Sequence, residues 1–293
     1  MVERLRLALL GACGLFVGVG LTLAFAGEAV FGPWRDAVAG AMLGGAFPAS
    51  LRAYAGLTDA ILGGSIVGKW VAIAWLVHEP LRRRERWALG VLLVGHLGWF
   101  ALDATASVLY GAAVNVWYID LLPLLLVGGL AAAMWPHTEP TPRRAGPVPR
   151  SVRLLTAICV GSVGIGLLSA FAIRAPIFHY YGEATARVYF DGAMGSDALA
   201  WQRFAYGLIG ATIAGHFLVL TGALLRAPRQ RWVLHAVATS MTAWFVVDTA
   251  GSLLHDGLFN VVQINLPSYL GTLAALAFAY RADAARDADT VRA

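Results

Sequence analysis

Charged side chains are scarce in this sequence, and their scarcity excludes a soluble domain. Only 13% of the 293 residues are Asp, Glu, Lys or Arg, whereas 59% are apolar, and the mean hydropathy is +0.68. A soluble domain has about a quarter of its residues charged and cannot hide this much apolar surface from water. A lipid bilayer is therefore the expected solvent. The basic residues lie in short clusters between apolar runs, which argues against a nucleic-acid partner.

The sequence also lacks the short motifs that indicate a catalytic or metal site. Its two cysteines, Cys13 and Cys159, have no CxxC partner and are expected to be small core residues. The seven histidines include no HExxH motif and no pair at a recurring ligand spacing. No catalytic residue, metal or cofactor is implied, and enzyme activity stays an open question.

Long apolar runs, in contrast, are abundant and predict membrane-spanning helices. Backbone groups at membrane depth must pair internally, and uninterrupted runs of about 20 apolar residues favour helices over barrel strands. A proline- and arginine-rich stretch between the fourth and fifth runs reads as a linker. The runs that qualify are eight: 7–26, 60–77, 87–110, 113–135, 154–173, 204–225, 232–254 and 258–280.

The arginines fall mainly on one side of these spans. Sixteen lie at the termini and at alternate connections, and five lie at the opposite connections. Because cytoplasmic loops are enriched in Lys and Arg, both termini are expected in the cytoplasm, with the protein in a bacterial-type inner membrane.

The second half of the chain echoes the first. WFALDATASVLYGAAVNVWYIDLLP begins at Trp99 and returns as WFVVDTAGSLLHDGLFNVVQINLP at Trp244; CGLFVGVG at Cys13 returns as CVGSVGIG at Cys159. The glycines of GVG and GIG are expected on a helix-packing face. The predicted fold is an all-α integral membrane protein with eight transmembrane helices in two tandem parallel four-helix repeats. Its expected parts are the first repeat (1–135), a cytoplasmic linker (136–150), the second repeat (151–281) and a cytoplasmic tail (282–293).

Each repeat carries polar residues in or beside its apolar spans. Asp103 lies about 24 Å along its helix from Trp87, which places it in the outer part of the bilayer. Ser107 follows one turn later on the same face, Asn115 opens the next helix, and Asp120 comes five residues after it. Two outward-facing clusters of substrate-binding side chains are therefore expected: Asp103, Ser107, Asn115, Asp120 and Arg52 in the first repeat, and Asp248, Ser252, Asn260 and Arg203 in the second.

Two interpretations of these clusters stay open. A charged side chain at bilayer depth costs about 2.5–3.5 kcal/mol on insertion scales, so it is seldom left without a partner. The groups either form a ligand or proton site or tie neighbouring helices in register. The external segments 27–51 and 174–202 are likewise either aromatic anchors at the membrane surface or a lid over the clusters.

Lys69 interrupts the second predicted helix about midway. Its side chain leans toward the helix N-terminus and so away from the nearer cytoplasmic surface, which hinders snorkelling. His96 is expected at a matching depth and shares a helical face with Asp103 at i+7. A Lys69–His96–Asp103 line would suit proton or anion handling. The second repeat has His216 in place of Lys69 but Met241 in place of His96.

Three classes of function are compatible with this pattern. The favoured one is binding or transport of a small molecule, ion or proton at the outward-facing polar clusters, with Lys69, His96 and His216 as further candidate residues. An accessory or assembly subunit of a membrane complex, or a homo-oligomer, would use the polar positions only to pack helices. An intramembrane lipid-modifying enzyme is the least favoured, because no paired-carboxylate or Ser/His signature accompanies the aspartates.

Overall fold

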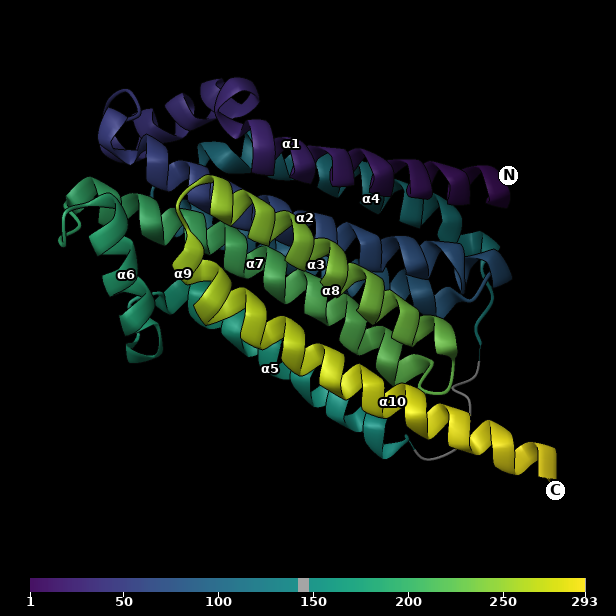
Figure 1. The fold of residues 1–293 in the computed structure, drawn as a ribbon. Helices are drawn as coiled ribbons and strands as arrows, with labels where there is room; N and C mark the ends of the chain where they lie inside the picture. Colours follow the sequence, from purple (N-terminus) through teal and green to yellow (C-terminus); the bar gives the residue numbers. More distant parts are fainter. Residues whose placement is uncertain (142–147, 293) are drawn as a thin grey trace.

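The structure is a computed structural model that describes residues 1–141 and 148–292, with side chains as far as Ala282. Apart from turns, this part of the chain is helical, and the long helices run roughly side by side (Figure 1). The short helices are α6 (His179–Tyr189) and α9 (Leu258–Asn260). The long ones are α1 (Val2–Leu43), α2 (Arg52–His78), α3 (Arg86–Leu109), α4 (Leu121–Met134), α5 (Arg150–Ala172), α7 (Ser196–Arg226), α8 (Arg231–Leu254) and α10 (Leu266–Arg292).

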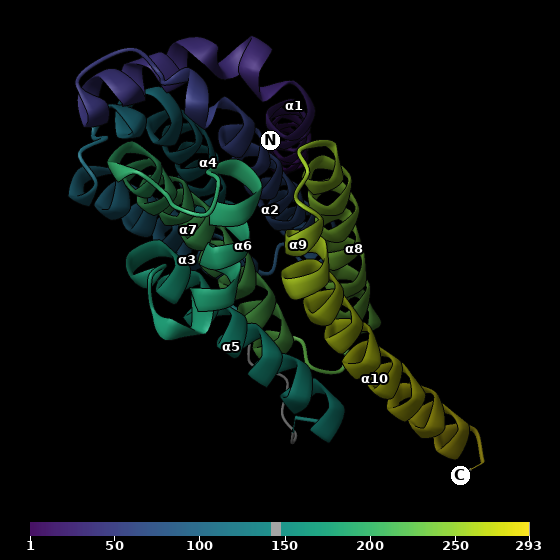
Figure 2. The same cartoon turned by 60° about the vertical axis from the view of Figure 1, so that its left-hand side comes forward.

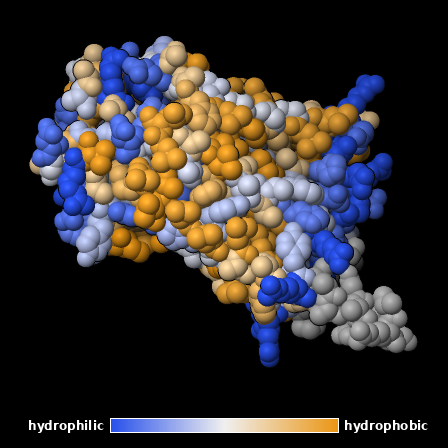
Figure 3. All heavy atoms as spheres, viewed as in Figure 1, coloured by the Kyte–Doolittle hydropathy of each residue, from blue (hydrophilic) through white to orange (hydrophobic). Residues whose placement is uncertain are grey.

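The predicted membrane architecture is confirmed at this level. Within the described residues, eight helical stretches are long and apolar enough to cross a membrane. The N-terminus and the end of α10 lie at one end of the bundle, and α6 lies at the other (Figure 1); these are called the terminal end and the α6 end below. On the face drawn in Figure 3, a hydrophobic belt separates two hydrophilic ends. The chain is therefore a multi-pass membrane protein.

Helix α1 extends further than predicted. The apolar run ends at Ala26, where φ is −141° and ψ is 25°, but the helix resumes after this kink and continues to Leu43. Charged residues such as Glu28 and Arg35 end the apolar run without ending the helix. The part of α1 between the kink and Leu43, called the outer part of α1 below, consequently lies over the α6 end of the bundle (Figures 1 and 2).

Helices α2 and α7 form the centre of the bundle, and most of their residues are buried. Helix α2 packs against α1 and α8, whereas α7 packs against α5 and α3. The helices of the two halves of the chain are therefore interleaved. Close approach depends on glycine: a Cβ on Gly63 of α2 would lie 2.4 Å from the Gly20 carbonyl oxygen of α1, and one on Gly210 of α7 would lie 2.3 Å from that of Gly166 on α5. One glycine of each GVG or GIG motif thus lies at a helix contact.

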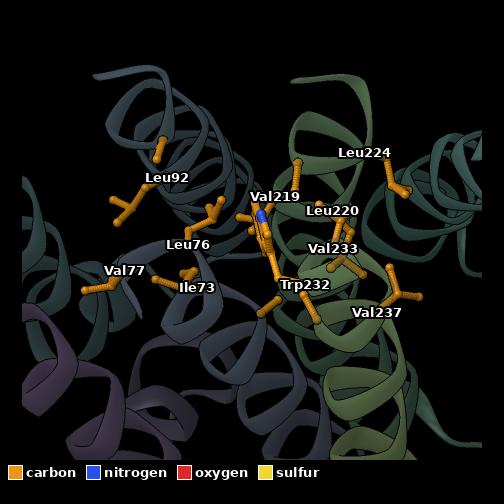
Figure 4. Packing of buried hydrophobic residues seen from close by; sticks show 14 of the residues in the cluster. Ile73, Leu76, Val77, Leu92, Val219, Leu220, Leu224, Trp232, Val233 and Val237 are labelled. Atoms are coloured by element: carbon orange, nitrogen blue, oxygen red, sulfur yellow. The ribbon is translucent and has the colours of Figure 1, made fainter. Parts of the chain in front are cut away.

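An apolar core fills the terminal end. Side chains of α2, α3, α7 and α8 meet there (Figure 4). Leu76, Leu92, Val219 and Leu220 are among them, and each is at most 1% exposed. Since lipid tails are as apolar as leucine, close packing rather than exclusion of water holds this core together inside a membrane. The polar clusters lie in the other half of the bundle, toward the α6 end.

Part of the linker and the tail lies outside the described residues. The linker was predicted over 136–150; its start packs on the α2–α3 turn, with backbone bonds of 2.8 Å from Glu139 N to Arg84 O and 3.0 Å from Arg86 N to Glu139 O. Residues 142–147, and the side chains beyond Ala282 in the tail predicted at 282–293, are not described. The backbone of α10 continues to Arg292.

Candidate functional site

The polar side chains predicted around Asp103 lie together. Ser107 Oγ and Asn115 Nδ2 donate to Asp103 Oδ1 at 3.3 Å and 3.0 Å. The Asn115 amide also contacts Ser107 Oγ at 3.0 Å and Asp120 Oδ2 at 3.5 Å. All four side chains are buried. The Asn115 amide therefore links the carboxyl groups of Asp103 and Asp120 at one buried place, where two like charges disfavour each other.

A π-helical turn brings Asn115 and Asp120 onto one face. Residues five apart diverge by more than a third of a turn on an α-helix, but the π-helical turn Val116–Asp120 has an i to i+5 repeat. The turn Val261–Asn265 does the same for Asn260 and Asn265. Such turns occur frequently at functional sites. The five-residue spacing in the sequence was visible, but a 3.6-residue repeat does not translate it into a contact.

The cluster around Asp248 has the same bonding pattern as the first. Ser252 Oγ and Asn260 Nδ2 donate to Asp248 Oδ1 at 3.0 Å and 2.8 Å, and Asn260 Nδ2 lies 2.9 Å from Ser252 Oγ. Asn265 replaces Asp120, and its amide donates to Asp248 Oδ1 at 2.8 Å and to Thr249 Oγ1 at 3.2 Å. Three side chains thus donate to the Asp248 carboxylate.

The two segments predicted to be external, 27–51 and 174–202, each place one aromatic hydrogen-bond donor against the asparagine of a cluster. Trp34 Nε1, from the outer part of α1, donates to Asn115 Oδ1 at 3.0 Å. Tyr181 of α6 donates to Asn260 Oδ1 at 3.2 Å and accepts from Tyr206 at 2.5 Å. Burial, with Tyr54 close by, raises the pKa of Tyr181 well above its ordinary value, so its hydroxyl remains a neutral donor. These contacts match the lid interpretation of the segments.

Lys69 is the only lysine of the chain, and it is 1% exposed. Its Nζ lies 3.7 Å from the centre of the Trp99 ring and 5.5 Å from that of Trp70. Within the described residues, no ion pair joins it to an acidic side chain. An aromatic face stabilises a desolvated ammonium by about 2 kcal/mol, which offsets only part of the cost of burying the charge.

A cavity of about 230 Å³ lies beside this lysine. It runs between α1, α2, α3 and α7 and the turn that precedes α4. Its lining is almost wholly apolar and aromatic, and the charged residues in that lining are Lys69 and Asp103. Tyr118 and Leu122 line one side of the cavity. They are also 62% and 64% exposed on the surface of the helix bundle. A mostly apolar cavity with a few convergent polar groups is typical of a small-molecule site.

His96 and His216 are buried, but neither extends the clusters. His96 Nε2 lies 3.0 Å from the carbonyl oxygen of Pro123, and its ring stacks on Trp99 at 5.3 Å. Among the described residues no hydrogen bond joins His96 to Lys69 or Asp103, so the predicted line is interrupted by the Trp99 ring. His216 stacks on Phe217 at 5.0 Å, and its Nε2 has no partner in the described part of the chain.

The two arginines expected in the clusters lie elsewhere. Arg52 pairs with Glu28 at 2.6 Å on the exposed surface, and Arg203 is exposed. A buried arginine is instead found on the outer part of α1, where Arg35 forms an ion pair with Asp59 of α2. No sequence pattern predicted this pair, because Arg35 lies in a segment expected outside the membrane and Asp59 directly precedes a predicted span.

A polar hollow of about 390 Å³ adjoins this ion pair at the α6 end, with His255 on its wall. The imidazole packs on the backbone of Gly56, where a Cβ would lie 2.5 Å from Nδ1. Burial lowers the pKa of His255 below its ordinary value, and the nearby Arg35 adds to this effect, whereas Asp256 and Glu28 oppose it. The ring is therefore neutral at pH 7.

No metal or family points to the activity. Within the described residues, no three His, Cys, Asp or Glu side chains are placed to share a metal ion, and Cys13 and Cys159 are buried free thiols. A scan against protein-family models, a search of curated proteins and a search of solved structures find no match. A functional assignment therefore rests on the geometry of the two clusters and the cavity.

Proposed function

We propose that this protein binds a small, predominantly apolar molecule inside the membrane and carries it between the cavity and the α6 end. The observation behind this proposal is the cavity that has Lys69 and Asp103 on its otherwise apolar wall. A buried ionisable residue in a membrane helix is costly and usually marks a substrate or ion path. Two such residues of opposite charge, on one cavity, favour binding over a purely structural tie.

The volume limits the size of the ligand. At about 230 Å³ the cavity exceeds the ~150 Å³ that accommodates benzene in an engineered protein cavity. It is smaller than the ~300 Å³ at which pockets for drug-sized molecules begin. A ligand with one aromatic ring or a short branched chain, together with one polar group, fits both the volume and the lining.

The helices around the cavity have features that favour transport. The fourth and eighth spans each begin with a π-helical turn followed within three residues by a proline, Pro123 or Pro267. Interrupted helices at matching positions are common at the substrate sites of transporters, where they serve as hinges. Tyr118 lies within the first of these turns, lines the cavity and is 62% exposed on the surface of the bundle. Motion of that turn would open a path to the bilayer.

We infer that the two clusters descend from one four-helix unit that was duplicated. The shared hydrogen-bond pattern, the paired π-helical turns and the equivalent glycine contacts support this inference. The even number of spans in each unit makes the repeats parallel. From the distribution of arginines we propose that the terminal end faces the cytoplasm of a bacterial-type cell and that the clusters face its outside.

A brominated aromatic alcohol tests the proposal. Trp34, Trp70 and Trp99 line the cavity, so p-bromobenzyl alcohol bound there will quench tryptophan emission saturably. Val19→Phe, which fills the cavity, will abolish the saturable component. Ile165→Phe is the matched control, because Ile165 occupies the equivalent GIG position, is 41% exposed and does not line the cavity.

Transport is tested with the same probe in proteoliposomes. Asp103→Asn and Lys69→Ala are expected to lower its protein-dependent flux. Quenching that stays linear in the wild-type protein, or that Val19→Phe leaves saturable, refutes the proposed site. Saturable binding without protein-dependent flux would restrict the function to binding.

A further inference from the structure

Lys69 is the single lysine of the sequence, and its amine has unusual surroundings. It contacts aromatic rings rather than a carboxylate, and it faces a cavity large enough for an organic molecule. Lysine brings chemistry that an aromatic or hydroxyl donor does not, because a desolvated amine in an apolar pocket is a nucleophile toward carbonyl groups. The corresponding position of the second half holds His216, which cannot form an imine.

The charges on the cavity wall select the ligand's polar group. With the Lys69 amine neutral, a ligand carboxylate would find no cation on the cavity wall and would add a like-charge contact to Asp103 where little water screens it. A neutral polar group adds no such contact. Among neutral groups, an aldehyde or ketone is the one that condenses reversibly with an amine to give an imine.

Resting on the cavity as the ligand site, we propose that Lys69 holds a small apolar aldehyde or ketone as an imine. In this reaction Nζ of the neutral amine attacks the carbonyl carbon, and a C–N bond forms. The first Nζ proton passes to the carbonyl oxygen to give a carbinolamine. The hydroxyl then takes a proton from a neighbouring acid, the C–O bond breaks as the C=N bond forms, water leaves, and the second Nζ proton returns to that acid. The step is a condensation, so neither an oxidant nor a reductant is needed.

The Asp103–Asp120 pair is placed to supply the proton. Asp103 lines the cavity, Asn115 Nδ2 lies 3.0 Å from Asp103 Oδ1 and 3.5 Å from Asp120 Oδ2, and Oδ1 of the buried Asp120 has no partner among the described residues. Two buried acids linked in this way favour retention of a proton, which can be given to the departing oxygen and recovered when the second Nζ proton leaves. The Trp99 ring, which contacts the free amine, would also stabilise a protonated imine nitrogen. Asp103 supplies the carboxyl group on the cavity wall that faces this cation.

The single lysine makes the test direct. The purified full-length protein is incubated with benzaldehyde and picoline borane, a neutral hydride donor that reduces an imine to a stable secondary amine. Peptide mass spectrometry then locates the benzyl group. The expected result is one adduct on Lys69 that forms faster than any adduct on the Met1 amine.

Four variants give this experiment its controls. Lys69→Met must lose the internal adduct while the Met1 adduct stays unchanged. Val19→Phe must slow labelling of Lys69, and Ile165→Phe must not. Asp120→Asn must lower the rate of labelling at Lys69, because the second acid of the pair is lost.

The outcomes separate the imine from the binding site. If p-bromobenzyl alcohol quenches saturably but benzaldehyde leaves Lys69 unlabelled, the imine is refuted and the proposed function stands. If neither probe reaches the cavity of a protein that retains its helical circular dichroism, both proposals fail. Labelling of Lys69 at an equal rate in Val19→Phe would also overturn the imine, because the cavity would then be irrelevant to it.

Discussion

The clusters around Asp103 and Asp248 share a framework and differ in their charges. Each has a serine and an asparagine bonded to one aspartate. The first adds Asp120 and has Lys69 nearby, whereas the second has Asn265 and His216 at the matching positions. The first cluster thus has one more acid and one more base than the second, so the formal charge of the two clusters is the same when the histidine is neutral.

The two clusters also differ in how fully their acids are satisfied, and the proposed function assigns the chemistry to the first. Asp248 receives three side-chain donors and is satisfied within its own cluster. In the first cluster, one asparagine amide contacts two acids, and one oxygen of Asp120 has no partner in the described part of the chain. Buried polar groups that are left partly satisfied mark places where a ligand or proton is expected. The second cluster shows what the framework needs for folding alone.

The largest expected effect is that of Asn265→Asp. This change gives the second cluster a second acid without the lysine that accompanies it in the first. We expect a loss of about 2.5 kcal/mol in the free energy of unfolding, near the insertion cost of an aspartate at bilayer depth. Adding His216→Lys should restore a large part of this loss, as measured by unfolding in mixed detergent. If the double variant were no more stable than Asn265→Asp alone, the lysine would not compensate for the second acid, and the explanation of the difference between the clusters by charge would be wrong.

Removal of either central aspartate should be the next largest effect. Asp248→Ala leaves three donors without their acceptor, whereas Asp103→Ala leaves two. At about 0.6 kcal/mol for each hydrogen bond in a membrane protein, the losses are roughly 2 and 1 kcal/mol. The same unfolding assay compares them. Equal losses would mean that the two clusters do not differ in how fully they satisfy their aspartate.

Asp120→Asn should change stability little, within about 0.5 kcal/mol, because it reproduces the amide donor that Asn265 provides. One amide hydrogen would stay unpaired, since Ala104 stands where Thr249 accepts from Asn265. Adding Ala104→Thr should therefore stabilise Asp120→Asn, but not the wild-type protein. A stabilisation of equal size in both backgrounds would show that the threonine acts independently of the amide.

The smallest expected effect is a pH dependence at the α6 end, where Tyr110 of the first half corresponds to His255 of the second. Because the folded state lowers the pKa of His255, the neutral ring is favoured on folding. Its contribution is complete above the unfolded value of about 6.5 and declines as the pH falls below it. His255→Gln should flatten the dependence of the unfolding midpoint on pH between 5 and 7, measured by circular dichroism. An unchanged slope would assign that dependence to other groups.

The fold was largely predictable because its determinants are local. Eight long apolar runs give eight helices at a membrane, and single charges such as Lys69 or Asp103 do not interrupt them. The continuation of α1 beyond Ala26 was missed, since hydropathy marks where a membrane span ends but not where a helix ends. The interleaving of α2 with α8 and of α3 with α7 depends on long-range packing, which a repeat in the sequence does not encode.

The site was predictable only in part, for a similar reason. Asp103, Ser107 and Asn115 could be grouped because a helical repeat and a short turn place them together. Arg52 and Arg203 were grouped with them by sequence position alone, and their side chains lie elsewhere. The aromatic support of Lys69 comes from Trp99 on another helix, and no local pattern connects two residues that far apart.

The most direct test of the account is a nuclear magnetic resonance measurement on its single lysine. Protein labelled with ¹⁵N at the lysine side chain contains one such site, Lys69, and it is titrated with p-bromobenzyl alcohol in detergent micelles. The account predicts one side-chain resonance that shifts saturably, with the shift abolished by Val19→Phe and retained in Ile165→Phe. A resonance that does not move while the probe binds the protein would contradict the claim that the ligand site is the cavity beside Lys69.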